Sequence, residues 1–186
     1  MQAALFLILS WFLSVSIAAI PTELHLFRPM TETPHQPNVV INDIKAGECT
    51  EQSRRIARED AWRCVVNEAI FDPCFVKPFG DRRTAICIDS PWAIKATQIN
   101  VSYLLDNHNH ATLDMSRALP FALELTNHDQ CLRVESKESI DGLPINYHCD
   151  SGSVLIGPVL RCQSEWTVLQ ARKEGVSSSK IIIAWF

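Results

Sequence analysis

Seven cysteines are the residues of this sequence with the widest range of possible chemistry. A cysteine can act as a nucleophile, bind a metal or form a disulfide, and its spacing separates these roles. No two cysteines have the CxxC spacing of zinc sites or thioredoxin-like motifs. A nucleophilic Cys64 or Cys74 would need a base, and no histidine lies between His35 and His108. The pattern therefore favours disulfides formed outside the cytoplasm. The cysteines are Cys49, Cys64, Cys74, Cys87, Cys131, Cys149 and Cys162.

The odd number of cysteines leaves at least one thiol free or bound to another chain. Proximity along the chain predicts a bridge between Cys131 and Cys149. It also predicts a bridge from Cys64, either to Cys49 or across a hairpin to Cys74. A dimer linked through the odd cysteine is a further expectation.

The segment LLDNHNHATLD is the best metal candidate in the sequence. In extended backbone His108 and His110 project to the same face, and Asp106 or Asp114 can add oxygen ligands. The segment does not fit a calcium loop, because histidines occupy ligand positions and the central glycine is missing. A solvated loop is the simpler interpretation, so we expect no cofactor.

The string HCDSGS resembles the loop around a serine-protease nucleophile. A triad also needs a histidine base beside the serine, an acid that orients the histidine, and an oxyanion hole. No second motif of that kind is present, and a glycine-containing hairpin turn explains the string. We therefore expect no enzymatic activity. A small secreted hydrolase, or a metal-binding protein using His and Asp residues of the second half, is the alternative.

The tryptophans are candidates for ligand binding. Each lies beside a cysteine, a proline or an apolar strand, and an exposed tryptophan can stack on a sugar or anchor a protein partner. The alternative is that they fill the core. The ligand-binding candidates are Trp62, Trp92 and Trp166.

Short runs of β-branched and apolar residues predict the elements that position these side chains. AWRCVVNEAIFDPCFV has a turn-prone Asn-Glu between two apolar runs and suits a hairpin. PINYHCDSGSVLIG reads as two strands around a turn, and EWTVLQA and KIIIAWF as a later pair. Only TEQSRRIAREDAW (50–62) suggests a helix, with Thr50 as its N-cap. We expect a mainly β, disulfide-stapled sandwich or barrel-like domain with one short N-terminal helix, or else an α+β fold.

The chain divides into three parts. Residues 1–18 have the apolar run and small-residue cleavage site of a signal peptide, which predicts a secreted or periplasmic protein without a stable membrane span after cleavage. Residues 19–46 contain four prolines and predict a linker or arm, and residues 47–186 predict one domain. The net charge of −4 and the lack of a basic stripe argue against nucleic acid as a partner.

A series of short motifs runs through the predicted domain: AWRCVVNEAIFDPCF, AIC, SPW, FALELTNHDQC, GLPINYHCDSG, EWTV and AWF. Together they resemble a group of exported bacterial proteins of unassigned function. In the pattern of that group six cysteines recur and Cys162 does not, so the resemblance implies that Cys162 is the unpaired thiol. It implies no catalytic residues. The resulting expectation is an exported, non-enzymatic binding or envelope protein for a protein or glycan ligand.

Overall fold

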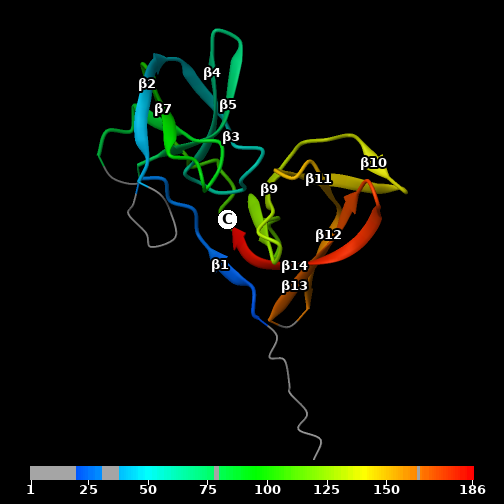
Figure 1. Ribbon diagram of the computed structural model, residues 1–186. Helices are drawn as coiled ribbons and strands as arrows, with labels where there is room; N and C mark the ends of the chain where they lie inside the picture. Colours follow the sequence, from blue (N-terminus) through cyan, green and yellow to red (C-terminus); the bar gives the residue numbers. More distant parts are fainter. Residues whose placement is uncertain (1–19, 31–37, 78–79, 163) are drawn as a thin grey trace, which may run out of the picture.

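The described part of the chain folds entirely into strands and loops. The computed structural model describes residues 20–30, 38–77, 80–162 and 164–186, and no helix occurs among them. The strands form two closed β-barrels that lie side by side, and the segment that begins with β1 (Glu23–His25) leads from one to the other (Figure 1). The predicted mainly β, barrel-like and disulfide-stapled architecture is confirmed.

The first barrel comprises residues 40–100. Its sheet has the order β2-β7-β6-β5-β4-β3, and all neighbours are antiparallel except β2 and β7, which are parallel. The strands are β2 (Val40–Ala46), β3 (Glu48–Gln52), β4 (Ala61–Val66), β5 (Ala69–Val76), β6 (Thr84–Cys87) and β7 (Lys95–Asn100). Because β2 runs into β3 through Gly47, the sheet closes on itself.

Gly47 marks the bend that closes the first barrel. A Cβ atom at this position would lie 2.7 Å from the carbonyl oxygen of Val65 and 2.7 Å from a methyl group of Val66. Its own backbone N–H donates to the carbonyl of Asn100 at 3.1 Å. Only glycine lets the continuous β2–β3 segment pass this close to β4.

The second barrel comprises residues 122–185 and is antiparallel throughout. The ring runs β8-β9-β11-β12-β13-β14 and closes because β14 pairs with β13 along its first half and with β8 along its second. In addition, β1 (Glu23–His25) pairs in parallel with the end of β14, and β10 (Ser139–Ile140) pairs with β11. The ring strands are β8 (Ala122–Leu125), β9 (Gln130–Arg133), β11 (Leu143–Cys149), β12 (Val154–Cys162), β13 (Glu165–Arg172) and β14 (Gly175–Trp185).

The helix predicted for residues 50–62 is wrong. β3 continues to Gln52, and the chain then turns at Ser53, whose Oγ accepts the N–H groups of Arg55 and Ile56. The backbone must reverse here because Cys49 and Cys64 are direct register partners on antiparallel strands and are bridged to each other. Tertiary pairing thus overrides the local helix propensity of the segment.

Three disulfides lie inside the barrels, and each joins residues that face one another on neighbouring antiparallel strands. Cys49–Cys64 and Cys74–Cys87 staple the first barrel, and Cys131–Cys149 staples the second. The alternative Cys64–Cys74 bridge is not formed, because Cys74 faces Cys87 across β5 and β6. Cys162 is a free, exposed cysteine at the end of β12. Three intrachain bridges indicate an oxidising, extracytoplasmic environment.

Parts of the predicted arm belong to the barrels. β1 adds to the second barrel and β2 is a wall of the first, so residues 19–46 carry strands of both sheets. The predicted signal peptide lies outside the described residues. Among those described, no helix has the length and apolar character needed to cross a bilayer.

Candidate functional site

An apolar core joins the two barrels and fixes their relative position. Phe27, which follows β1, is 1% exposed and packs against Phe75 of the first barrel, with ring centroids 5.3 Å apart. It also contacts Phe121, just before β8, at 5.6 Å, and Trp185 of β14 at 6.5 Å. One aromatic side chain therefore touches both barrels.

Arg58 ties the same junction with hydrogen bonds. Its guanidinium is buried, donates to both carboxylate oxygens of Asp60, and donates to the backbone carbonyls of Phe27 and Phe186. The Cζ atom lies 4.9 Å from the centroid of the Phe75 ring. The first barrel, the β1 segment and the end of β14 thus meet at one cation.

A cleft of about 540 Å³ opens at the junction and is lined by side chains of both barrels. The first barrel and its loop supply Arg55, Arg63, Ile70 and Asp72; the second supplies Leu132, Arg133, Val134, Glu135, His148, Cys149 and Asp150. A cleft between two rigid units, with convergent polar groups, is the usual form of a ligand site.

Arg55 and Arg133 join the two walls of the cleft by hydrogen bonds. The Nε of Arg55 donates to the carbonyl of Arg133 at 3.2 Å, and Nη1 of Arg133 donates to the carbonyl of Arg55 at 3.2 Å. Arg55 also donates to the carbonyl of Asp72 at 2.9 Å and lies over the Phe121 ring. Burial lowers the pKa of Arg55, although the nearby carboxylates oppose this effect. The pair gives the cleft a fixed cationic wall.

Asp72 is the half-buried acid of the cleft. Its carboxylate accepts hydrogen bonds from the Ser53 hydroxyl and from the backbone N–H of Arg54 at 3.0 Å. Burial raises the pKa of Asp72 above its ordinary value, even though these bonds and the charges of Arg55 and Arg63 act in the opposite direction. Perturbed acids in clefts are frequent at functional sites.

Arg63 and His148 also line the cleft, and their side chains form fewer hydrogen bonds than those of Arg55 and Asp72. Within the described part of the chain, the side chain of Arg63 forms no hydrogen bond or ion pair, and it acts on Asp72 through its charge alone. His148 is exposed on β11, opposite Leu132 of β9, and no hydrogen bond joins it to Asp72 among the described residues. Arg63 is therefore the cleft guanidinium with its donors still available.

A second cavity, of about 770 Å³, lies between the β1–β2 connection and the first barrel. Its lining includes Arg28, Arg58, Lys77 and Arg82, beside apolar side chains such as Leu105. The guanidinium of Arg58 already donates to the carbonyl of Phe186 at the junction, and that of Arg82 donates to Asn107 at 3.0 Å. Met30 and Lys77 on its wall adjoin residues 31–37 and 78–79, which the structure does not describe. The cleft between the barrels is therefore the better defined site.

The tryptophans predicted to bind a ligand are buried or partly buried. Trp62 is 5% exposed in the first barrel, and Trp166 is 8% exposed in the second. Trp92 is partly buried against the core between the barrels. Although Trp62 touches the larger cavity, neither it nor Trp166 offers a free face for stacking.

The two predicted metal-binding histidines do not converge. His110 packs against Trp62 in a tilted arrangement, with ring centroids 4.2 Å apart, and its Nδ1 lies 2.9 Å from the carbonyl of Glu59. His108 points into solvent, 3.7 Å from a carboxylate oxygen of Asp106. Neither belongs to a cluster of three or more metal-ligating side chains in the described ranges.

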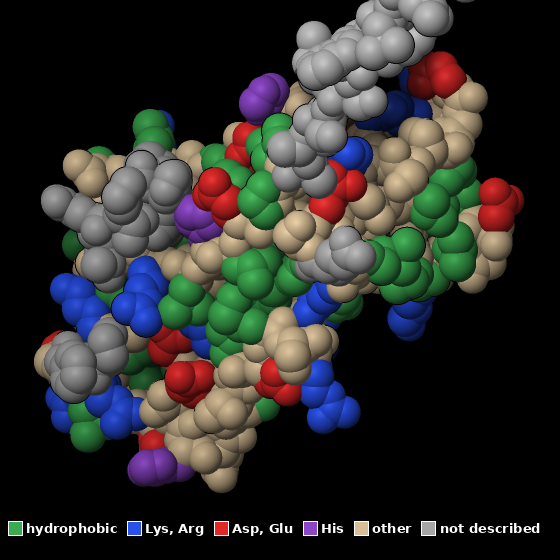
Figure 2. All heavy atoms as spheres, turned by 90° about the horizontal axis from the view of Figure 1, so that it is seen from below, with side chains coloured by type: hydrophobic (Ala, Val, Ile, Leu, Met, Phe, Trp, Pro, Cys, Tyr) green, Lys and Arg blue, Asp and Glu red, His purple; other side chains and the backbone are tan. Residues whose placement is uncertain are grey.

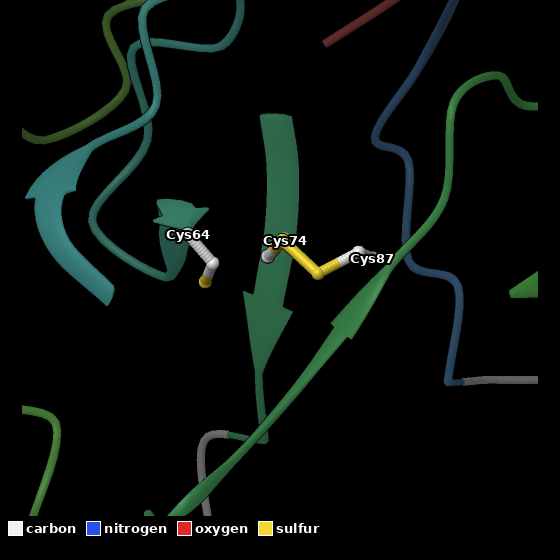
Figure 3. A group of neighbouring side chains, drawn as sticks. All are labelled: Cys64, Cys74 and Cys87. Carbon is white, nitrogen blue, oxygen red and sulfur yellow. A yellow bond between two sulfur atoms is a disulfide. The ribbon is translucent and has the colours of Figure 1, made fainter. Parts of the chain in front are cut away.

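Cysteine sulfurs contribute to both clusters of potential metal ligands among the described residues. Those of Cys64, Cys74 and Cys87 lie within 4.8 Å of one another, and Cys64 lies beside the Cys74–Cys87 bridge (Figure 3). The second cluster comprises Asp129, Cys131 and Cys149. Because every one of these sulfurs is part of a disulfide, the clusters are core contacts of the oxidised protein.

The serines of HCDSGS belong to a buried polar network. Asp129 accepts hydrogen bonds from Ser151 at 2.5 Å, from Ser153 at 3.1 Å and from the amide of Gln170 at 2.9 Å. No histidine contacts these serines in the described structure, so neither has a base. The network satisfies buried polar groups and holds the β11–β12 turn.

The arginines of the cleft were not predicted as site residues from the sequence. Arg55 and Arg133 lie far apart along the chain, and only the packing of one barrel on the other brings them together. On the face drawn in Figure 2, basic side chains are interspersed with acidic ones around a central group of hydrophobic side chains. The linear sequence places Arg55 and Arg63 in one arginine-rich segment, but nothing in it pairs that segment with Arg133.

Comparison with known proteins gives no family assignment. No family model matches the chain, and neither the curated proteins nor the solved structures include a match. Functional inference therefore depends on the geometry of the molecule.

Proposed function

We propose that this chain is an exported, non-enzymatic binding protein of the periplasm or the extracellular medium, with a protein or glycan ligand. The cleft between the barrels carries this proposal. It is lined by side chains from both barrels, and its walls are held by the Arg55–Arg133 bonds and by the shared aromatic core. A preformed site of this kind binds without a large ordering cost.

Two further observations support binding at this cleft. Ile70 is 56% exposed on the wall of the cleft. A ligand that buries this apolar side chain gains binding free energy. The disulfides stiffen both barrels, and export through residues 1–18 fits the oxidising environment that they indicate.

One observation favours the alternative of a secreted hydrolase. The cleft brings His148 into the same space as Asp72 and Asp150, which is an acid–base set. A panel of ester, peptide and glycoside substrates tests this alternative. Turnover by the wild-type protein that is lost in both D72N and H148N would establish it and would exclude the non-enzymatic assignment.

The binding proposal is tested with a displayed peptide library and a glycan array, screened against the wild-type protein and two variants. I70W fills the cleft, and I44W places the same side chain at a 62% exposed position of β2 away from it. We expect ligands that bind the wild-type protein and I44W but not I70W. If every ligand found binds I70W as well as the wild-type protein, the cleft is not the site.

A further inference from the structure

The inner part of the cleft carries more positive than negative charge. The side chains of Arg55, Arg63 and Arg133 are half-buried there. Asp72 is the half-buried acid beside them, and burial favours its neutral form by raising its pKa. Glu135 and Asp150 are exposed at the rim, where solvent screens their charges. The interior therefore suits an anionic group of a ligand.

Arg63 is the side chain best able to bind that group. Arg55 and Arg133 already donate to carbonyls across the cleft, whereas Arg63 has no hydrogen-bond partner among the described residues. A guanidinium presents parallel N–H groups that match the two oxygens of a carboxylate. Binding a ligand carboxylate would satisfy donors that the fold leaves open.

The apolar part of the cleft is aliphatic. Ile70, Leu132 and Val134 line it, and no Phe, Tyr or Trp is among its described lining residues. A sugar ring usually stacks on an aromatic face, and the cleft offers none. Aliphatic side chains of a peptide can instead pack beside the arginines.

We propose that the cleft between the barrels binds an acidic, aliphatic peptide segment of a partner protein, with a carboxylate of the segment on Arg63. Its aliphatic side chains cover Ile70 and Leu132. The inference rests on the binding function proposed above and specifies the ligand of that site.

The test measures binding of three probes by fluorescence anisotropy with the full, oxidised protein. The first is a labelled peptide, Asp-Leu-Glu-Ile-Asp, with an amidated C-terminus; the second is its counterpart without carboxylates, Asn-Leu-Gln-Ile-Asn, also amidated; the third is a uronic acid oligosaccharide. The protein variants are R63Q and a matched control, R54Q, which removes the same charge from a side chain that is 52% exposed and outside the cleft.

We expect the acidic peptide to bind the wild-type protein and its affinity to fall about tenfold or more in R63Q, because a charge-assisted bidentate contact is lost. R54Q should remain within about twofold of the wild-type protein. Equal weakening in R63Q and R54Q would show attraction by net charge alone and would overturn the proposal. Equal binding of the neutral peptide would also overturn it.

Two other outcomes separate this inference from the function on which it rests. Binding of the oligosaccharide without the peptide would overturn the peptide ligand and leave a binding protein with a glycan ligand. If no probe binds, the acidic peptide is wrong, and the library screen with I70W and I44W decides the binding function independently.

Discussion

At the scale of single residues, Asp72 makes stability depend on pH. Burial raises its pKa in the folded state above its ordinary value of 3.8, so the folded protein keeps this proton to a higher pH than the unfolded chain does. The stability contributed by the protonated carboxyl is present below the ordinary value and is lost as the pH rises through the raised pKa.

The substitution D72N removes this dependence, because the amide does not titrate. We expect the free energy of unfolding of the wild-type protein, relative to that of D72N, to fall as the pH rises from about 3.5 to 7. Urea unfolding of both proteins across this range measures the difference. A difference that is constant, or that rises with pH, would contradict the raised pKa.

Arg58 illustrates how much one buried cation can hold together. Its side chain is 5% exposed and donates to Asp60 and to two backbone carbonyls from distant segments. The substitution R58M should lower the free energy of unfolding by about 3 kcal/mol or more, because a carboxylate and two carbonyls lose their donor. R54M, at a 52% exposed ion pair, should change it by about 0.5 kcal/mol or less. Equal, small effects would show that Arg58 is not the clamp of the junction.

At the scale of elements, the strands were the predictable part. A turn-prone Asn-Glu between two apolar runs identified the β4–β5 hairpin, whose turn residues Asn67 and Glu68 have φ values of 47° and 70°. The helix over residues 50–62 was mispredicted because its propensity was local, whereas β3 is held by a long-range bridge and by the Ser53 turn. The start of β14 at Gly175 was also missed, since the polar residues before Lys180 pair with β13.

Mass spectrometry tests the pairing of the disulfides between neighbouring strands. Because each bridge joins residues that face one another across neighbouring strands, peptide mapping without reductant should find Cys49–Cys64, Cys74–Cys87 and Cys131–Cys149. Alkylation of the denatured protein should label Cys162 alone. A Cys64–Cys74 peptide, or several labelled cysteines, would contradict the register of the first barrel.

A disulfide-linked dimer through Cys162 stays a prediction. Running the same sample on a gel without reductant tests it.

At the scale of the whole molecule, the candidate site depends on how the barrels pack. Sequence patterns identified strands and cysteines, but Arg55 and Arg133 meet only because Phe27 and its neighbours join the two cores. Packing also explains why two of the predicted ligand-binding tryptophans are largely covered: Trp62 and Trp166 each fill one barrel. The properties of the cleft belong to the arrangement of the barrels and not to any local motif.

Substitution of Phe27 tests whether the two barrels unfold as one cooperative unit. Because its ring packs against both, F27A should lower the stability of the whole chain by about 3 kcal/mol or more, and calorimetry should show one transition in the wild-type protein. L24A, at a 47% exposed position of β1, is the matched control and should have a much smaller effect. Two resolved transitions in the wild-type protein would show that the barrels unfold independently.

An NMR titration shows whether ligands bind between the barrels. The ¹⁵N-labelled protein is titrated with the tightest ligand from the peptide and glycan screens. We expect the largest amide shift changes on residues of both cleft walls, such as Arg63 and Ile70 on one side and Leu132 and Val134 on the other. Changes confined to one barrel, or centred on the cavity beside Trp62, would contradict binding between the barrels.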